Sequence, residues 1–474
     1  MSNNNKNKQL AEIKNNYLSK VSSTLSITNK LLTEINNRSS VPSDDFRVVI
    51  PDVNFQRYLS EELGINVTEG TVSFGNIKGI TEVYCSGFSI QSLEGLEYFL
   101  SLNELYCDNF GESKNSPSRN SISTLDLSNN THLKILWCGD NNLTNIDISK
   151  NIELTELNCS YNNLKHLDTS NNIMLTDLDC YYNKLTDLNL SKNIELSKLN
   201  CSNNILSNLN ISKNIKLTDL ISKNNQLSHL DVSGNPTLNN LNVDFCNLIN
   251  IDISNNKELT NLNVGFNNLI SIDISNNEEL TNLNCSHNKL IDLDNSKNLK
   301  LKKLSCGFNN LTHLNTFHNN MLTDLFCYNN NLKNLDVSKN NTLKILKCGN
   351  NQLSSLNITE NKLLTDLDCN NNKSINIDLS KNINLTILNC SNNDLSNLDI
   401  HNNIALKVLD CSNNKLSNLD ISENKLLGDL NCSNNKLIRL DISENKLLIN
   451  LNCSNNKINE LNVSHNKFLH FLEQ

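Results

Sequence analysis

The sequence predicts a β-rich repeat solenoid of about 18 turns, and three observations lead to that prediction. Thirteen of the 16 cysteines lie in one series with a step of 21 residues, from Cys138 to Cys453. Ser222, Val243 and Val264 fill the three remaining places, so the repeat runs on from residue 138 without insertion or deletion. Leucines and asparagines recur with the same step. A constant internal period of this length is typical of one elongated array and not of separate globular domains.

Each turn has two sides of similar length, and both have the residue pattern of a short strand. The repeated phrase is LxxLxCxxNxLxxLDISxNxx, as in residues 133–153 and 154–174. On one side Leu157 and Cys159 flank Asn158, and on the other Ile146 and Ile148 flank Asp147. This period of two puts alternate side chains inside a strand. We therefore expect two short parallel strands in every 21-residue turn.

Two strands per turn also predict the shape of the array. A solenoid curves when strands about 4.8 Å apart on one side face helices that need about 8–10 Å on the other. Neither side of this repeat has the length or spacing of a helix. The sequence therefore predicts low curvature.

The cysteines and asparagines have structural explanations. The cysteine position holds Val243 and Val264 in two turns, which marks it as a small apolar core position, so we expect a ladder of free, buried thiols. One asparagine recurs from Asn141 to Asn456 with a single exception, Cys246, and another recurs from Asn151 to Asn466 without exception. A buried amide without a partner costs about 1–3 kcal/mol, so both series are expected to bond backbone groups of their own and neighbouring turns.

The chain divides into three parts by composition. Residues 1–43 are a tail with an amphipathic pattern that suits one helix over residues 9–36, residues 44–79 form an N-terminal cap with a short helix at 53–63, and residues 80–474 form the repeat array. The Gly-, Ser- and Pro-containing segment 111–120 is expected to be an inserted loop. At the end of the array no further capping segment is recognisable, which leaves an open strand edge.

Charge and hydropathy exclude several classes of protein. Residues 1–43 have a net charge of +4 and the remainder of the chain has −13, so the long body is acidic and lacks the clustered basic face that nucleic acid requires. No apolar run is long enough to span a bilayer, and the N-terminus lacks the apolar core of a signal peptide. With reduced cysteines, these features predict a cytoplasmic or host-intracellular protein.

No catalytic, cofactor-binding or metal-binding residues are expected. The DISxN phrase resembles the start of a calcium loop at Asp147, but Ile152 and Asn158 stand where such a loop needs Gly and Glu. No combination of nucleophile, base and acid recurs, and no Gly-rich phosphate loop occurs. The sequence therefore predicts a protein that is not an enzyme.

The phrase LxxLxCxxNxLxxLDISxN resembles the leucine-rich repeat family, specifically its nested 21-residue class, over residues 80–474. Residues 48–105, including SLEGLEYFLSLNELYC, look like the cap and first repeats of internalin-like proteins. The resemblance implies a right-handed coil and a binding scaffold that presents its strand face to another macromolecule.

Aromatic residues interrupt an otherwise polar surface and are the candidate binding residues. The positions around the cysteine strand carry Trp137, Tyr161, Tyr181, Tyr182, Phe245, Phe266, Phe308, Phe326 and Tyr328. Exposed rings on one strand face are candidate anchors for a protein partner. The alternative is that these rings are local packing between neighbouring turns. A second functional hypothesis is a structural protein, with oligomerisation through the open C-terminal edge or the N-terminal helix.

Overall fold

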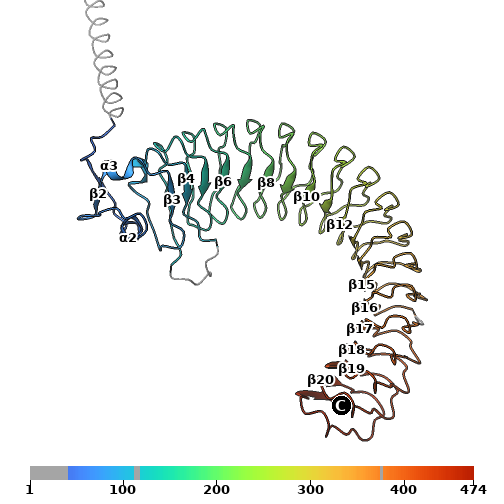
Figure 1. The fold of residues 1–474 in the computed structure, drawn as a ribbon. Coiled ribbons are helices and arrows are strands. Elements are labelled where there is room, and N and C mark those ends of the chain that lie inside the picture. Colours follow the sequence, from blue (N-terminus) through green and yellow to red (C-terminus); the bar gives the residue numbers. More distant parts are fainter. Residues whose placement is uncertain (1–40, 111–117, 374–376) are drawn as a thin grey trace, which may run out of the picture.

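The computed structural model describes residues 41–110, 118–373 and 377–474, which form a small N-terminal unit followed by a curved solenoid (Figure 1). The helical elements are α2 (Val53–Glu61), α3 (Phe74–Ile77) and the 3₁₀ helix η1 (Leu96–Tyr98). The strands are β1 (Arg47–Val49), β2 (Thr71–Ser73), β3 (Glu82–Tyr84), β4 (Glu104–Tyr106), β5 (Ile135–Trp137), β6 (Glu156–Asn158), β7 (Asp177–Asp179), β8 (Lys198–Asn200), β9 (Asp219–Ile221), β10 (Asn240–Asn242), β11 (Asn261–Asn263), β12 (Asn282–Asn284), β13 (Lys303–Ser305), β14 (Asp324–Phe326), β15 (Ile345–Lys347), β16 (Asp366–Asp368), β17 (Ile387–Asn389), β18 (Val408–Asp410), β19 (Asp429–Asn431), β20 (Asn450–Asn452) and β21 (Phe471–Glu473).

A single ladder of 19 parallel strands, β3 to β21, runs the length of the solenoid. Each strand pairs in register with the strands of the turns before and after it, so that Leu157 lies beside Leu136 and Leu178. The middle residue of a strand points inward, and the two flanking residues face outward, as in β6. The predicted β-rich repeat solenoid is confirmed.

The interior of each turn is filled by aliphatic side chains and one thiol. In the turn that contains β6, Leu154, Leu157, Cys159 and Leu164 are all fully buried. All 16 cysteines are buried free thiols, which confirms the expected cysteine ladder. Burial disfavours the thiolate and raises the pKa of Cys285 to about 12, so such thiols stay protonated and behave as small apolar groups.

The first asparagine series connects each turn to the one before it. The Nδ2 atom of Asn162 donates to the backbone oxygens of Cys138 and Cys159, at 3.0 and 3.1 Å. Its Oδ1 atom accepts a hydrogen bond from the backbone N–H of Leu143 at 2.9 Å. The same pattern repeats along the array and confirms the predicted ladder. One buried amide therefore satisfies backbone groups of two turns at once.

The second asparagine series bonds in a different way. The Nδ2 atom of Asn172 donates to the backbone oxygens of Ile148 and Asn151, at 3.0 and 2.8 Å. Its Oδ1 atom is buried without a hydrogen-bond partner. In turns where the residue 24 positions before this asparagine has a polar side chain, that side chain donates to the asparagine Oδ1. Thr169 Oγ1, for example, donates to Asn193 Oδ1 at 2.8 Å. Carbonyl oxygens tolerate incomplete bonding better than N–H groups, so the two donated bonds dominate.

The expected second strand of each turn does not form as a continuous ladder. On that side the described residues show only isolated bridges, at Asn189↔Asn210, Asn315↔Asp336 and Leu356↔Ile377. Turns interrupt the backbone on that side of each coil. The segments between them are too short to pair as continuous strands.

The prediction of low curvature is also wrong. The array bends into a pronounced arc, and the strands labelled β15 to β20 lie along its inner side (Figure 1). Continuous strand pairing holds only one side of the turns at the strand spacing of about 4.8 Å, so the turn-rich side is free to spread.

The N-terminal unit packs against the first turn of the array. Strands β1 and β2 pair antiparallel, and α2 lies within the range expected for a helix. Asp52 caps α2 by accepting hydrogen bonds from Asn54 and Phe55 N–H, and its second oxygen accepts from the N–H groups of Gln91 and Ser92. The hydroxyl of Tyr58 accepts a hydrogen bond from Tyr84 N–H at 2.8 Å, so it covers part of the outer edge of β3.

Two sequence expectations fall wholly or partly on residues outside the described ranges. The predicted amphipathic helix at residues 9–36 lies outside them, as do residues 111–117 of the predicted loop. Asn120, at the end of that predicted loop, is buried and donates to the backbone oxygens of Cys85 and Cys107. It therefore extends the first asparagine series to the early turns.

Replacing Cys246 with asparagine should stabilise the protein. Cys246 occupies the one gap in the first asparagine series, and its Sγ lies 3.4 Å from the backbone oxygen of Ser222. An amide would add stronger donor and acceptor bonds, each contributing about 1 kcal/mol. The unfolding midpoint in urea should rise for Cys246→Asn and fall for the reciprocal control Asn267→Cys. A fall for both variants would contradict the role assigned to the ladder.

Candidate functional site

The nine predicted binding residues occupy three positions around the cysteine of a turn. Trp137 and Phe326 are the last residues of β5 and β14 and directly precede a cysteine. Tyr181 and Tyr328 directly follow a cysteine. The remaining five lie two residues after the position that cysteine occupies in most turns: Tyr161, Tyr182, Phe245, Phe266 and Phe308.

Four of the rings in the last position form a continuous stack, which we call the central ring stack: Phe245, Phe266, His287 and Phe308. The ring centroids are 3.9 Å apart between Phe245 and Phe266 and between Phe266 and His287. The last pair, His287 and Phe308, is 4.0 Å apart. Interplanar angles of 10° to 20° make these pairs parallel stacks. Tyr328 packs edge-on against Phe308 at 5.5 Å.

The backbone at the central ring stack is in the left-handed region. Phe245, Phe266, His287 and Phe308 have φ between 50° and 55°. Asparagine tolerates this conformation, but it is strained for bulky residues, at a cost of about 1–3 kcal/mol each. Nine other turns have asparagine at this position: Asn203, Asn224, Asn329, Asn350, Asn371, Asn392, Asn413, Asn434 and Asn455. The rings are therefore not what the backbone of this position favours.

The central ring stack is also exposed. Phe245 is 49% exposed, Phe266 39% and Phe308 42%. Four residues further along the first three of these turns, Ile249, Ile270 and Ile291 form a second exposed apolar row. The rings therefore pack on one another, as local packing between turns requires, and also present an apolar surface to solvent.

A second group of rings comprises Tyr161, Tyr181 and Tyr182. The Tyr161 ring lies 4.9 Å from Tyr181 and 5.0 Å from Tyr182. Tyr161 and Tyr181 share a hydrogen bond between their hydroxyls at 3.2 Å, and this bond, with burial, raises the pKa of Tyr161 to about 12. Tyr161 and Tyr182 have φ of 50° and 56°, so they share the backbone conformation of the central ring stack.

A third group lies on the first strands of the ladder and includes Trp137. Its ring is 5.2 Å from Tyr106, which in turn stacks on Tyr84 at 4.9 Å. The indole Nε1 donates to Glu156 Oε1 at 2.6 Å. Phe326 is half-buried and, among the described aromatic side chains, is not paired with another ring.

Three residues of these groups were not predicted from the sequence: Tyr84, Tyr106 and His287. Tyr84 and Tyr106 directly precede Cys85 and Cys107, so they share the position of Trp137. His287 shares the position of Phe266 one turn further along. The signal was available, because aligning every turn on its cysteine places all three in the aromatic positions.

The surface opposite the strand ladder carries a row of aspartates whose bonds lie within their own turns. Asp147 Oδ1 accepts a hydrogen bond from the N–H of Ser149 at 2.9 Å, and this bond lowers the pKa of Asp147. In the described residues no three His, Cys, Asp or Glu side chains come together as metal ligands. Within the same residues, none of the helices has the length and apolarity that crossing a membrane requires.

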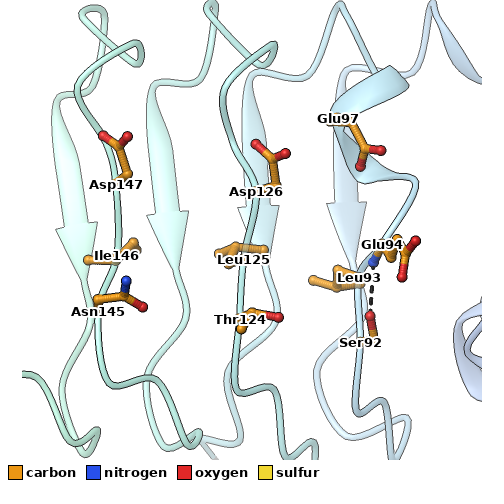
Figure 2. Close-up of a pocket in the computed structure, with 10 residues that line it drawn as sticks. All are labelled: Ser92, Leu93, Glu94, Glu97, Thr124, Leu125, Asp126, Asn145, Ile146 and Asp147. Carbon is orange, nitrogen blue, oxygen red and sulfur yellow. Dashed lines mark hydrogen bonds between the residues drawn. The ribbon is translucent and has the colours of Figure 1, made fainter.

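A shallow hollow on that opposite surface lies beside the first turns. Figure 2 shows Ser92, Leu93, Glu94, Glu97, Thr124, Leu125, Asp126, Asn145, Ile146 and Asp147 around it. Three of its four carboxylates have backbone donors, since Gly95 N–H donates to Glu97 Oε2, Ser128 N–H to Asp126 Oδ1 and Ser149 N–H to Asp147 Oδ1, each at 2.9 Å. Burial raises the pKa of Glu97. These carboxylates stabilise the local turns, and we assign no ligand to the hollow.

Comparison with known proteins identifies the fold. No family model and no curated protein matches the sequence. A solved structure of the functional domain of InlJ from Listeria monocytogenes, described as including a cysteine ladder, is 28% identical, with a TM-score of 0.53 over 88% of this chain and 77% of that one. A leucine-rich repeat protein of Leptospira interrogans is 22% identical, with a TM-score of 0.62 over 84% and 97%. The Arabidopsis receptor kinase HAESA, solved with the peptide hormone IDA and the co-receptor SERK1, is 21% identical, with a TM-score of 0.66 over 84% and 73%.

The central ring stack predicts a pH dependence that can be attributed to one residue. Burial between Phe266 and Phe308 lowers the pKa of His287, so the folded state binds the proton less well than the unfolded state. Stability should therefore fall as the pH drops below the usual histidine pKa of about 6.5. Thermal unfolding of the wild type and of His287→Asn should be compared at pH 7.5 and 5.5. The wild type should lose more stability than the variant, and equal losses would contradict the assignment.

Proposed function

Because the chain is a leucine-rich repeat protein with a cysteine ladder in its 21-residue turns, we propose that it is a non-enzymatic scaffold that binds a protein partner. The proposed anchors are the nine aromatic residues around the cysteine strand, with the central ring stack as the principal contact. Proteins of this fold often use an extended surface of the array for recognition.

The observation that carries this proposal is the exposure of rings on a backbone that favours asparagine. Phe245, Phe266 and Phe308 combine a left-handed φ with exposed fractions of 39% to 49%. Backbone strain and exposed rings both oppose stability, and such costs concentrate at functional sites. Large aromatic anchors that become buried on binding supply much of the affinity of protein interfaces.

The fold neighbours support the class of function by analogy. HAESA is a receptor solved with a peptide hormone and a co-receptor, so the same architecture holds polypeptide ligands in that protein. Fold similarity does not transfer a particular partner, because function depends on the site that a fold carries. The partner of this chain is therefore argued from its own surface.

Self-association is the second candidate function. All three residues of β21 are exposed, including Phe471 at 52% and Leu472 at 43%. An exposed parallel edge with apolar side chains favours pairing with another chain. In this alternative the aromatic groups act as packing between turns and the strand edge carries the function.

We also propose the division of the chain into a tail at residues 1–43, a cap at 44–79 and the array at 80–474. The bonds from Asp52 and Tyr58 to the first turn support the role of the cap.

Asparagine variants of the ring stack test the binding function with little risk to the fold. Phe245, Phe266 and Phe308 are replaced together by asparagine, the residue that nine other turns use at this position. Proteins captured from lysate by the wild-type chain should be lost, since removing one anchor that contributes about 2 kcal/mol weakens binding about 30-fold. Quantitative mass spectrometry of the captured proteins measures the effect.

The matched control is Phe317→Ser, which removes an equally exposed ring away from the proposed face. Phe317 is 50% exposed, and the corresponding positions in neighbouring turns are Ser296 and Ser338. This variant should capture the same proteins as the wild type. Unchanged capture by the triple variant would refute the proposed anchors, and light scattering that reveals a dimer lost on changing β21 would favour self-association.

A further inference from the structure

The first five strands of the ladder present an outward surface that differs from the rest, and we call it the acid–aromatic face. The parallel register places its side chains in two rows about 4.8 Å apart from strand to strand. The face comprises Glu82, Glu104, Glu156, Asp177 and Asp179 together with Tyr84, Tyr106 and Trp137.

The negative charge of this face is poorly balanced. Register pairing puts Glu82 beside Glu104 and Glu156 beside Asp177, and like charges in neighbouring strands repel each other. Strands β3 to β7 contain no lysine or arginine, and Asp177 of β7 pairs with Lys198 of β8 at 3.7 Å. Burial raises the pKa of Asp177. The positive charge of Lys198 lowers it, and the negative charge of Glu156 raises it further.

Some later strands carry a lysine that pairs with a carboxylate of the next strand. Lys303 lies 3.8 Å from Asp324, and Lys347 lies 2.5 Å from Asp366. In the described part of the chain, Glu82, Glu104 and Glu156 have no ion pair with lysine or arginine. Later strands also carry carboxylates without an ion pair, such as Asp410 and Asp429. Among the described residues, the carboxylates of the first strands differ in that they accept hydrogen bonds from aromatic side chains.

Aromatic donors hold these carboxylates at the edges of the rings. The Tyr84 hydroxyl lies 3.1 Å from both Glu82 Oε2 and Glu104 Oε2, so one phenol links two carboxylates. The Trp137 indole donates to Glu156 Oε1 at 2.6 Å. Tyr106 packs between the other two rings, at 4.9 Å from Tyr84 and 5.2 Å from Trp137. Each bond leaves lone pairs of the carboxylate open to a further donor.

We infer that the acid–aromatic face binds an arginine-bearing extended segment of a protein partner. A guanidinium donates two parallel hydrogen bonds to a carboxylate and stacks on an aromatic face, and this surface offers both within one row of strands. A lysine ammonium has the charge but lacks the planar group that donates two parallel hydrogen bonds and stacks flat on a ring. The inference rests on the proposed role as a protein-binding scaffold, but apart from Trp137 it uses residues outside the nine proposed anchors.

The test measures binding of an eight-residue peptide of alternating arginine and glycine to the full chain by fluorescence anisotropy. The variant Glu104→Gln with Glu156→Gln keeps side-chain shape and removes two charges. The matched control, Asp410→Asn with Asp429→Asn, removes two charges from the far end of the same ladder. The first variant should weaken binding at least tenfold, the control should stay within twofold, and a lysine–glycine peptide should bind the wild type several-fold more weakly.

Several outcomes would overturn the inference. Equal weakening by both double variants would mean general attraction to an acidic chain, and equal affinity for the two peptides would remove the case for arginine. Peptide binding that appears only after deletion of residues 1–43, whose net charge is +4, would identify that segment as the occupant instead. The triple asparagine variant of the ring stack should still bind the arginine peptide, so failure of the proposed function and failure of this inference are distinguishable.

Discussion

The amide side chains of two asparagines in each turn are the interaction on which this fold depends. Asn162 donates to one backbone oxygen of the preceding turn and one of its own turn. Asn172 donates to two backbone oxygens of the preceding turn. No single turn buries enough apolar surface to fold alone, so stability comes from joining neighbours. Because the amide reaches backbone atoms at fixed separations of 24, 21 and 3 residues, an insertion within a turn would break the ladder.

This constraint explains where the chain varies. Most inward positions hold aliphatic side chains or a thiol, and Val243 and Val264 replace cysteine without altering the step. The outward positions touch no neighbour that enforces identity, so they carry differences from turn to turn. Rings gather at the middle turns and carboxylates with rings at the first strands, as Phe266 and Glu104 illustrate. A uniform interior thus supports two distinct surfaces on one side of the arc.

The sequence predicted the parts of the fold that depend on side-chain identity within a turn. Burial of Cys159 and bonding of Asn162 followed from alternation and from the cost of an unpaired amide. The predictions of a second strand and of low curvature were wrong. The alternation at Ile146 and Ile148 also fits an extended segment between turns that does not pair with neighbouring turns as a continuous ladder. The stacking of rings could not be predicted, because it depends on the spacing and backbone angles of successive turns. The asparagines at the position of His287 in other turns did indicate a left-handed φ there.

Hydrogen exchange of the folded chain tests the central claim most directly. Amides that donate to neighbouring turns, such as those of Cys159 and Thr155, and amides that donate to an asparagine Oδ1, such as that of Leu143, should exchange slowly. Protection should recur every 21 residues through the middle of the array, with fast exchange at exposed turn residues between the protected ones. Uniform exchange without this period, or protection limited to the N-terminal unit, would contradict an array held together by its asparagine ladders.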